Sequence, residues 1–369
     1  MPGIDRRVIQ NFDWTLLFLA LGLAFVGVIN LISAAPEGGE GLLPRAAWRQ
    51  FLWLGLASLA LVITLVPDYR RLERVAIPIY AACIALLVLV LIIAPVINGS
   101  QRWIVLGPAH LQPSELMKLA IILLFARLLA RYGSSRELHL VDLALPAFLL
   151  AIPCVLVLRQ PDLGTAMLIA LVSGTFLLVA KIRLRSLSWL AAAGIAGASA
   201  AWFWYLHDYQ KERLLTFLDP ERDPLGTAYH AIQSQIAIGS GGVFGQGFNQ
   251  GPQSQLDFLP EQQTDFVFSV LAEEWGFVGA AVVLLLYLAM MVRGLVIARA
   301  SKDAFGAYLA VGVVALLFWA GAINVGMVLG VAPVVGVPLP FLSYGGSSLL
   351  VSMVGVGLLM NVSMRRYVF

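Results

Sequence analysis

Long, nearly unbroken apolar runs are the feature of this sequence that most restricts its fold. The chain has 369 residues, of which 60% are hydrophobic and only 12% are charged. So few charged residues cannot cover the surface of a soluble domain of this length. A run of about 20 apolar residues is long enough to cross about 30 Å of hydrocarbon as a helix. The sequence therefore predicts an all-α integral membrane protein, because no β-barrel alternation interrupts these runs.

Hydropathy over windows of about 19 residues separates the chain into ten spans. The longest stretch between two spans is 207–274, in which apolar and charged residues alternate as in a helix that lies on a membrane surface. We therefore expect a single polytopic membrane domain, 1–369, with interfacial helices inside the loop 207–274. The predicted spans are 14–34, 48–66, 75–97, 114–131, 142–158, 163–180, 186–206, 275–297, 306–330 and 344–363.

Lysine and arginine are distributed unequally between the two sides of these spans. Sixteen lie near the termini and in alternate loops, whereas seven lie in the remaining loops. Because cytoplasmic loops carry the excess of positive charge, both termini are predicted to face the cytoplasm. The loop 207–274 is then outside, and any chemistry that it performs is extracytoplasmic.

Composition also argues against two classes of partner. The net charge is only +3, and the basic residues are spread among loops instead of forming one basic surface, so no nucleic-acid partner is expected. The two cysteines lie inside apolar runs, and the four histidines lack the spacing of metal ligands. Neither a structural metal site nor a redox site is supported by these residues.

Carboxylates gather in LPEQQTDFVFSVLAEEWG, residues 259–276. Asp265 stands directly before an apolar run, where partial loss of water raises the pKa of a carboxylate toward that of a general base. As an open alternative, Thr264 or Asp265 is the N-cap of the helix that follows. Glu273 and Glu274 lie deeper and are functional candidates, because charge near lipid is costly; an exposed pair ahead of the membrane is the plainer alternative.

Several other charged residues are predicted on the same side of the membrane. Glu115 and Lys118 are three residues apart on one helix, where they form either an internal ion pair or part of a cationic lining for a lipid head group. Arg102 and Arg213 are positive charges placed outside, against the overall bias. Asp162 is either the cap of the sixth span or a second acidic member of the site.

The sequence contains six longer motifs in or beside the loops between the predicted spans. They are GSQRWIVLG, LQPSELMKLA, RQPDLGTA, FLDPERDPLGTAYHAIQSQIAIGSGG, LPEQQTDFVFSVLAEEWG and PLPFLSYGGSS. In order and spacing they resemble the SEDS family of cell-wall glycosyltransferases over nearly the whole chain. Tyr229-His230 and QSQL at 253–256 are more similar to the elongation members of that family than to its division members. One departure is Gln263, since the family usually carries His before its TDF motif.

The resemblance implies a bundle of the GT-C type and a peptidoglycan polymerase of the bacterial inner membrane. Its substrate would be lipid II, and it would work beside a class B penicillin-binding protein, surrounded by membrane lipids. The Asp of the TDF motif is the essential catalytic residue of the family, which corresponds to Asp265. The family motifs also carry over to Arg102, to Glu115 with Lys118, and to Asp162.

This chemistry suits the residues on independent grounds. A lipid diphosphate leaves without a proton, so the reaction needs one base and positive charge at the phosphates. Asp265 is predicted to deprotonate the 4-hydroxyl of the acceptor sugar, which attacks with inversion to give a β-1,4 linkage. The predicted contacts to substrate and diphosphate are Arg102, Glu115, Lys118, Asp162, Arg213 and Glu261, with a divalent cation, Mg²⁺ or Mn²⁺, as a helper.

Two other functions remain open at the level of sequence. A lipid II flippase would use helices broken by residues such as Pro78 and Pro146, as transporters often do. The chain shows no inverted repeat, however, and its acidic residues cluster outside instead of at the midplane. A scaffold that only anchors a synthase would tolerate replacement of every charged residue in the outer loops. The enzyme is the favoured interpretation.

Overall fold

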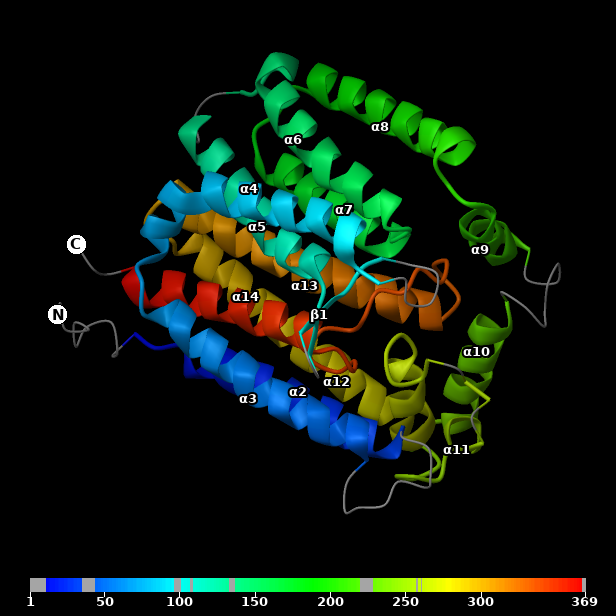
Figure 1. The fold of residues 1–369 in the computed structure, drawn as a ribbon. Helices are drawn as coiled ribbons and strands as arrows, with labels where there is room; N and C mark the ends of the chain where they lie inside the picture. The colour runs from blue at the N-terminus through cyan, green and yellow to red at the C-terminus, as the bar shows by residue number, and fades with distance from the viewer. Residues whose placement is uncertain are drawn as a thin grey trace.

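Within the residues that the structure describes, eight helices are long and apolar enough to cross a membrane (Figure 1). This computed structural model describes residues 11–34, 44–95, 101–106, 109–132, 137–219, 228–256, 258–259 and 261–366. Two further helices, α5 (Pro113–Tyr132) and α7 (Leu163–Val179), pack among the eight. The eight are α2 (Trp14–Ser33), α3 (Arg45–Leu65), α4 (Tyr69–Ile93), α6 (Leu140–Arg159), α8 (Leu184–Trp204), α12 (Val267–Arg299), α13 (Ala304–Val328) and α14 (Gly346–Arg365). Each of the ten predicted spans thus coincides with a helix, and the all-α membrane fold is confirmed.

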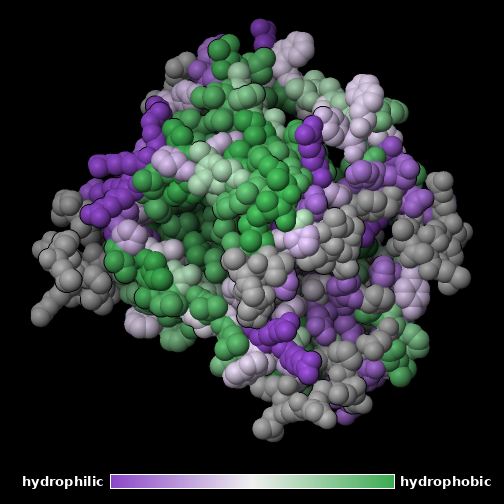
Figure 2. Space-filling view, in the orientation of Figure 1, coloured by the Kyte–Doolittle hydropathy of each residue, from purple (hydrophilic) through white to green (hydrophobic). Residues whose placement is uncertain are grey.

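Helices at the centre and at the edge of the bundle bury different side chains. α5, α13 and α14 are buried along most of their length, which allows α5 to carry charged residues that lipid would not accept. α2 and α8 instead turn apolar side chains outward, with Phe18 66% and Leu184 83% exposed. Figure 2 shows apolar side chains over the middle of one face and polar side chains toward its left and right edges. This surface suits a bundle whose middle is surrounded by hydrocarbon.

The two ends of the bundle carry different structures. α2 begins and α14 ends at the left of Figure 1, whereas α9 (Asp208–Leu218), α10 (Tyr229–Gly241) and α11 (Pro252–Gln255) lie at the opposite end. These three helices fall inside 207–274, where interfacial helices are predicted; residues 220–227 of that loop lie outside the described part. A two-stranded antiparallel hairpin, β1 (Ile104–Leu106) with β2 (Ala109–Leu111), is an addition to the predicted fold.

α12 differs from its predicted span because it begins in the loop and bends at Gly276. The predicted span begins at 275, whereas the helix begins at Val267. Gly276 has φ of +65°, and a Cβ there would lie 2.3 Å from the backbone nitrogen of Gly245, so glycine is required at this bend. The predicted start was wrong because a hydropathy window finds apolar content, whereas the outer turns of α12 contain two buried glutamates.

Candidate active site

Asp265 lies in a tight turn directly before α12. The carbonyl of Glu261, a residue with φ of +56°, accepts hydrogen bonds from the backbone N–H groups of Thr264 and Asp265, both at 3.1 Å. Phe266 is the N-cap of α12, and no side chain among the described residues caps that helix by a hydrogen bond. The N-cap interpretation of Thr264 or Asp265 was therefore wrong. The Asp265 carboxylate is not used to start the helix.

Two distant segments hold this turn in place. Ahead of α14, Ser343 Oγ donates to the carbonyl of Thr264 at 2.5 Å, and the backbone N–H of Tyr344 donates to the carbonyl of Gln263 at 2.8 Å. At the end of α2, the carbonyl of Ala34 accepts from the Gln263 side-chain amide at 3.3 Å. Gln263, which replaces the histidine that the family usually carries, thus contacts α2. Both segments therefore help to hold the turn in place.

Four charged groups from different parts of the chain act on the Asp265 carboxylate. Burial raises its pKa from an ordinary 3.8 to about 6; the charges of Glu261 and Asp162 raise it as well, whereas those of Arg213 and Arg102 lower it. Among the described residues, no hydrogen bond ends on this carboxylate. The charges of four predicted site residues thus act on a fifth, Asp265, whose carboxylate is able to accept a proton near neutral pH.

Asp162 has both of the roles that the sequence left open. Its side chain caps α7 by accepting hydrogen bonds from the backbone and the hydroxyl of Thr165, at 3.1 and 2.9 Å, and it also accepts from Gln112 at 3.0 Å. The guanidinium of Arg102 lies 4.0 Å from it and donates to the carbonyls of Gln160, at 2.9 Å, and Pro161. Arg102 therefore braces the turn between α6 and α7, and its predicted contact with a diphosphate stays a prediction.

Glu115 and Lys118 form a buried ion pair in α5. The Lys118 ammonium lies 2.6 Å from the Glu115 carboxylate, and both side chains are about 95% buried. This position favours the internal ion pair, one of the two interpretations that the sequence allowed. The predicted contact of the pair with a diphosphate stays a prediction.

Glu273 and Glu274 are structural anchors of the loop that precedes the site. Both are buried, so the exposed pair considered from sequence was wrong. Glu273 accepts from the backbone N–H groups of Gln253 and Ser254, and Glu274 accepts from that of Asn249 at 3.1 Å. These bonds fasten the loop and α11 onto the outer part of α12.

Asn324 and Gly336 also belong to the site, although neither was predicted. The side-chain amide of Asn324, in α13, donates to the carbonyl of Asp265 at 2.8 Å. Gly336 lies so close that a Cβ on it would be 3.3 Å from Oδ2 of Asp265. An asparagine inside an apolar span is a costly polar residue, and this signal could have identified it.

His230 approaches the site from α10. Its ring lies 6.1 Å from the ring of Phe266, the residue after the candidate base. Burial lowers the pKa of His230, the charge of Arg213 lowers it further, and that of Glu261 opposes the change. The imidazole is therefore neutral at neutral pH, and it is a second titrating group whose behaviour has to be separated from that of Asp265.

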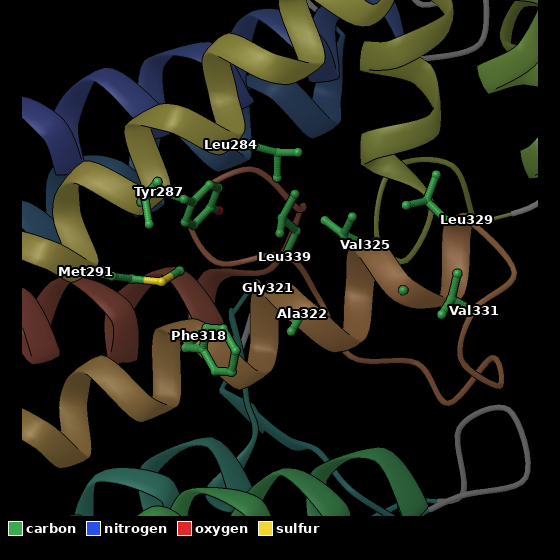
Figure 3. A pocket seen from close by; sticks show the side chains of 12 residues that line it. Leu284, Tyr287, Met291, Phe318, Gly321, Ala322, Val325, Leu329, Val331 and Leu339 are labelled. Atoms are coloured by element: carbon green, nitrogen blue, oxygen red, sulfur yellow. The ribbon is translucent and has the colours of Figure 1, made fainter.

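An apolar cavity of about 380 Å³ lies away from this cluster, between α12 and α13 (Figure 3). Its lining includes Leu284, Met291 and Phe318, and Tyr287 is its one titratable side chain among the described residues. The Tyr287 hydroxyl donates to the carbonyl of Pro340 and thereby joins α12 to the segment that carries Gly336. Because it offers no base beside a positive charge, this cavity is not a candidate for the chemistry.

Comparison with known proteins places the chain in one family. The sequence profile of the FtsW/RodA/SpoVE family, described as "Cell cycle protein", matches residues 10–368. The chain belongs to this family. Among relatives in the FtsW/RodA/SpoVE family, the peptidoglycan glycosyltransferase MrdB of Escherichia coli K12 is 42% identical over 362 residues, covering 96% of this chain and 94% of MrdB. The peptidoglycan glycosyltransferase RodA of Treponema pallidum is 33% identical and covers 98% and 99% of the two chains.

Solved structures of the family have the same fold. A chain from work described as "Structural coordination of polymerization and crosslinking by a peptidoglycan synthase complex" has a TM-score of 0.81 at 36% identity, covering 97% of this chain and 99% of that one. RodA of Thermus thermophilus has a TM-score of 0.71 at 32% identity, covering 96% and 98%. The predicted SEDS resemblance is confirmed.

Proposed function

We propose that this chain is a peptidoglycan glycosyltransferase that polymerises lipid II into β-1,4-linked glycan strands. The observation that carries the proposal is the Asp265 carboxylate, which does not cap α12. Its pKa of about 6 lies close to the pH at which a general base must work. The full-length similarity to MrdB and RodA, which are peptidoglycan glycosyltransferases by name, supports the same activity.

In the proposed reaction, Asp265 takes the proton from the acceptor sugar's 4-hydroxyl. The hydroxyl oxygen then attacks the anomeric carbon of the donor from the face opposite the diphosphate, and the bond to the diphosphate breaks with its electron pair on the leaving group. Arg213 is the best placed cation for that charge, because it is exposed and acts electrostatically on Asp265. Arg102 contributes positive potential from the braced turn between α6 and α7.

Among the described residues, no group of three or more His, Cys, Asp or Glu side chains could hold a metal ion. The helper cation stays a prediction, because Mg²⁺ is usually bound by one or two carboxylates together with substrate phosphates. Asp162, which with Glu261 raises the pKa of Asp265, already accepts hydrogen bonds from Gln112 and Thr165. The mechanism above therefore uses only the side chains of this chain.

The contacts at the opposite end of the bundle favour an enzyme over a flippase. There Arg293 pairs with Asp13 at 2.9 Å, joining α12 to the start of α2. Tyr69 donates to Asp303 at 2.5 Å, joining α4 to the start of α13. A flippase would have to part these helices to admit a head group. The charged cluster around Asp265 lies at the other end, where the enzyme interpretation places the chemistry.

We further propose that the chain lies in the bacterial cytoplasmic membrane with both termini inside. The distribution of lysine and arginine supports this orientation. The proposed partner is a class B penicillin-binding protein, which would cross-link the glycan. The similarity to a chain of a peptidoglycan synthase complex supports a partner of this kind.

Purified protein supplied with lipid II in detergent tests the proposal, because a flippase makes no polymer without a membrane to cross. Wild-type protein should produce glycan strands, and Asp265→Asn and Asp265→Ala should produce none while eluting as folded protein. The assay should be run with and without a class B penicillin-binding protein. Full polymerisation by folded Asp265→Ala protein would exclude Asp265 as the base.

A further inference from the structure

Asn324 is a fully buried residue of α13 whose side-chain amide joins two loops. Its Nδ2 atom donates to the carbonyl of Asp265 at 2.8 Å and to the carbonyl of Val337 at 2.8 Å. An –NH2 group has two hydrogens, so each carbonyl receives one. A leucine would be less costly here, because an amide inside an apolar helix must be compensated by hydrogen bonds. What this asparagine contributes is the bridge between the two carbonyls.

The bridge sets the position of the Asp265 carboxylate against the segment that follows α13. Gly336, next to Val337, has φ of +71° and lies against the carboxylate, since a Cβ on it would be 3.3 Å from Oδ2. On the other side of the same segment is the start of α7, where a Cβ on Gly164 would be 2.4 Å from the carbonyl of Val335. The segment is thus fixed between α7 and Asp265, and it limits where the carboxylate can stand.

The backbone N–H of Asp265 donates to the carbonyl of Glu261 at 3.1 Å within the turn, whereas the bonds from the segment ahead of α14 hold the neighbours of Asp265. Ser343 binds the carbonyl of Thr264, and Tyr344 binds that of Gln263. Among the described residues, the side chain that binds the backbone of Asp265 is that of Asn324. Loss of these two bonds would leave the turn closed but would free the candidate base to shift along the segment.

We propose that Asn324 is a positioning residue of the glycosyl transfer, which acts by holding Asp265 at a fixed distance from Val337 and Gly336. This inference rests on the proposed function. Asn324 does not contact the substrate in this scheme. It determines how closely the Oδ atoms of Asp265 approach the acceptor hydroxyl, and a reacting group displaced by about 1 Å can lose roughly 100-fold in rate.

The test is the Asn324→Ala variant, assayed for glycan synthesis from lipid II per folded molecule. We expect kcat to fall roughly 10- to 100-fold, with KM for lipid II and the midpoint of the pH–rate profile nearly unchanged. A residue with only a structural role would lower the yield and the melting temperature, and would leave kcat of the folded fraction alone. Retention of wild-type kcat by folded Asn324→Ala protein would overturn the inference.

Asn361 provides a matched control at the other end of the bundle. It is also fully buried, and its Nδ2 atom also joins two carbonyls, those of Thr64 and Pro67, at 2.5 and 2.8 Å. Asn361→Ala should therefore lower the melting temperature as Asn324→Ala does, while kcat of the folded protein is unchanged. An equal fall of kcat in both variants would show a general loss of rigidity and would contradict the positioning role.

Gly336→Ala tests the same geometry with Asn324 intact. Because φ of +71° favours glycine, this variant also loses stability, and kcat is measured per folded molecule. The new methyl group would press on Oδ2 of Asp265 from the segment that Asn324 fixes, so kcat should again fall with little change of KM. Unchanged kcat in folded Gly336→Ala protein would overturn the inference. If wild-type protein makes no glycan from lipid II, the proposed function itself fails. If wild type is active and either folded variant keeps its kcat, only the inference fails.

Discussion

The carboxylate of Glu273 accepts a hydrogen bond from the backbone N–H of Ser254, 3.2 Å away, at the start of α11. The N–H of Gln253 donates to the other carboxylate oxygen at 2.8 Å. The first N–H groups of a helix have no partner inside it, so Glu273 satisfies two of them with one buried side chain. This contact explains a carboxylate near the membrane without giving it a role in the reaction.

Glu273→Gln should therefore destabilise the protein and leave the chemistry intact. Glutamine keeps one acceptor oxygen and turns an –NH2 toward the second N–H, so we expect the free energy of unfolding to fall by about 1–3 kcal/mol. Thermal melts in detergent would measure this loss. Asp265→Asn is the matched control, and it should show the opposite pattern: the protein should fold and should make no glycan. Loss of activity in well-folded Glu273→Gln protein would show that Glu273 takes part in the reaction.

The rate of glycan synthesis should rise with pH as Asp265 loses its proton. Only the ionised carboxylate accepts a proton, so kcat/KM should climb through a midpoint near pH 6 and level off above it.

The same titration should affect stability. Because the pKa of Asp265 is raised in the folded state, its protonated form favours folding, and this contribution to the free energy of unfolding is lost as pH rises from about 4 through 6. Asp265→Asn should then be at least as stable as wild type above pH 6.

His230 is the control for that pH profile, because its imidazole also titrates in the acidic range. His230→Gln removes this group and keeps a polar side chain of similar length. We expect the midpoint near pH 6 to remain. A profile that becomes flat in His230→Gln protein would assign the proton transfer to the imidazole and not to Asp265.

The charges of Glu261 and Arg213 should move the midpoint in opposite directions. The negative charge of Glu261 raises the pKa of Asp265, so Glu261→Gln should shift the midpoint to lower pH; the positive charge of Arg213 lowers that pKa, so Arg213→Gln should shift it to higher pH. Both side chains are exposed, and added salt should reduce both shifts. Shifts of the same sign in the two variants would contradict this arrangement.

The spans and the candidate base could be predicted from the sequence because each depends on a local pattern. Continuous apolar runs locate the helices, and a carboxylate directly before such a run locates Asp265 at the edge of the bundle. The first turns of α12, before residue 275, were missed because they do not form a continuous apolar run. Their glutamates lower the apolar content, although the turns that contain them are buried under the loop.

The surroundings of Asp265 could not be predicted, because they are contacts between residues far apart in the chain. Asn324 binds a carbonyl 59 positions before it, and Gln112 binds Asp162 50 positions after it. Neither pairing has a periodic signature in the sequence. The N-cap alternative for Asp265 likewise could be rejected only when the dihedral angles placed Phe266 at the cap.

The ion pair of Glu115 and Lys118 allows a test that separates structure from substrate binding. Lys118→Met leaves the Glu115 charge buried and unpaired, which should cost about 3–5 kcal/mol of folding free energy. Removing both charges, as Glu115→Gln with Lys118→Met, should restore most of that stability, since a buried pair is close to neutral against apolar or uncharged replacements.

Glycan synthesis by the double variant then decides the role of the pair. We expect activity per folded molecule to return with the stability, because both side chains are buried and their charges cancel each other at 2.6 Å. The measurement is kcat and KM for lipid II beside the melting temperature of the same preparation. A stable double variant with a KM raised severalfold would instead place Lys118 at the diphosphate, as the resemblance implies.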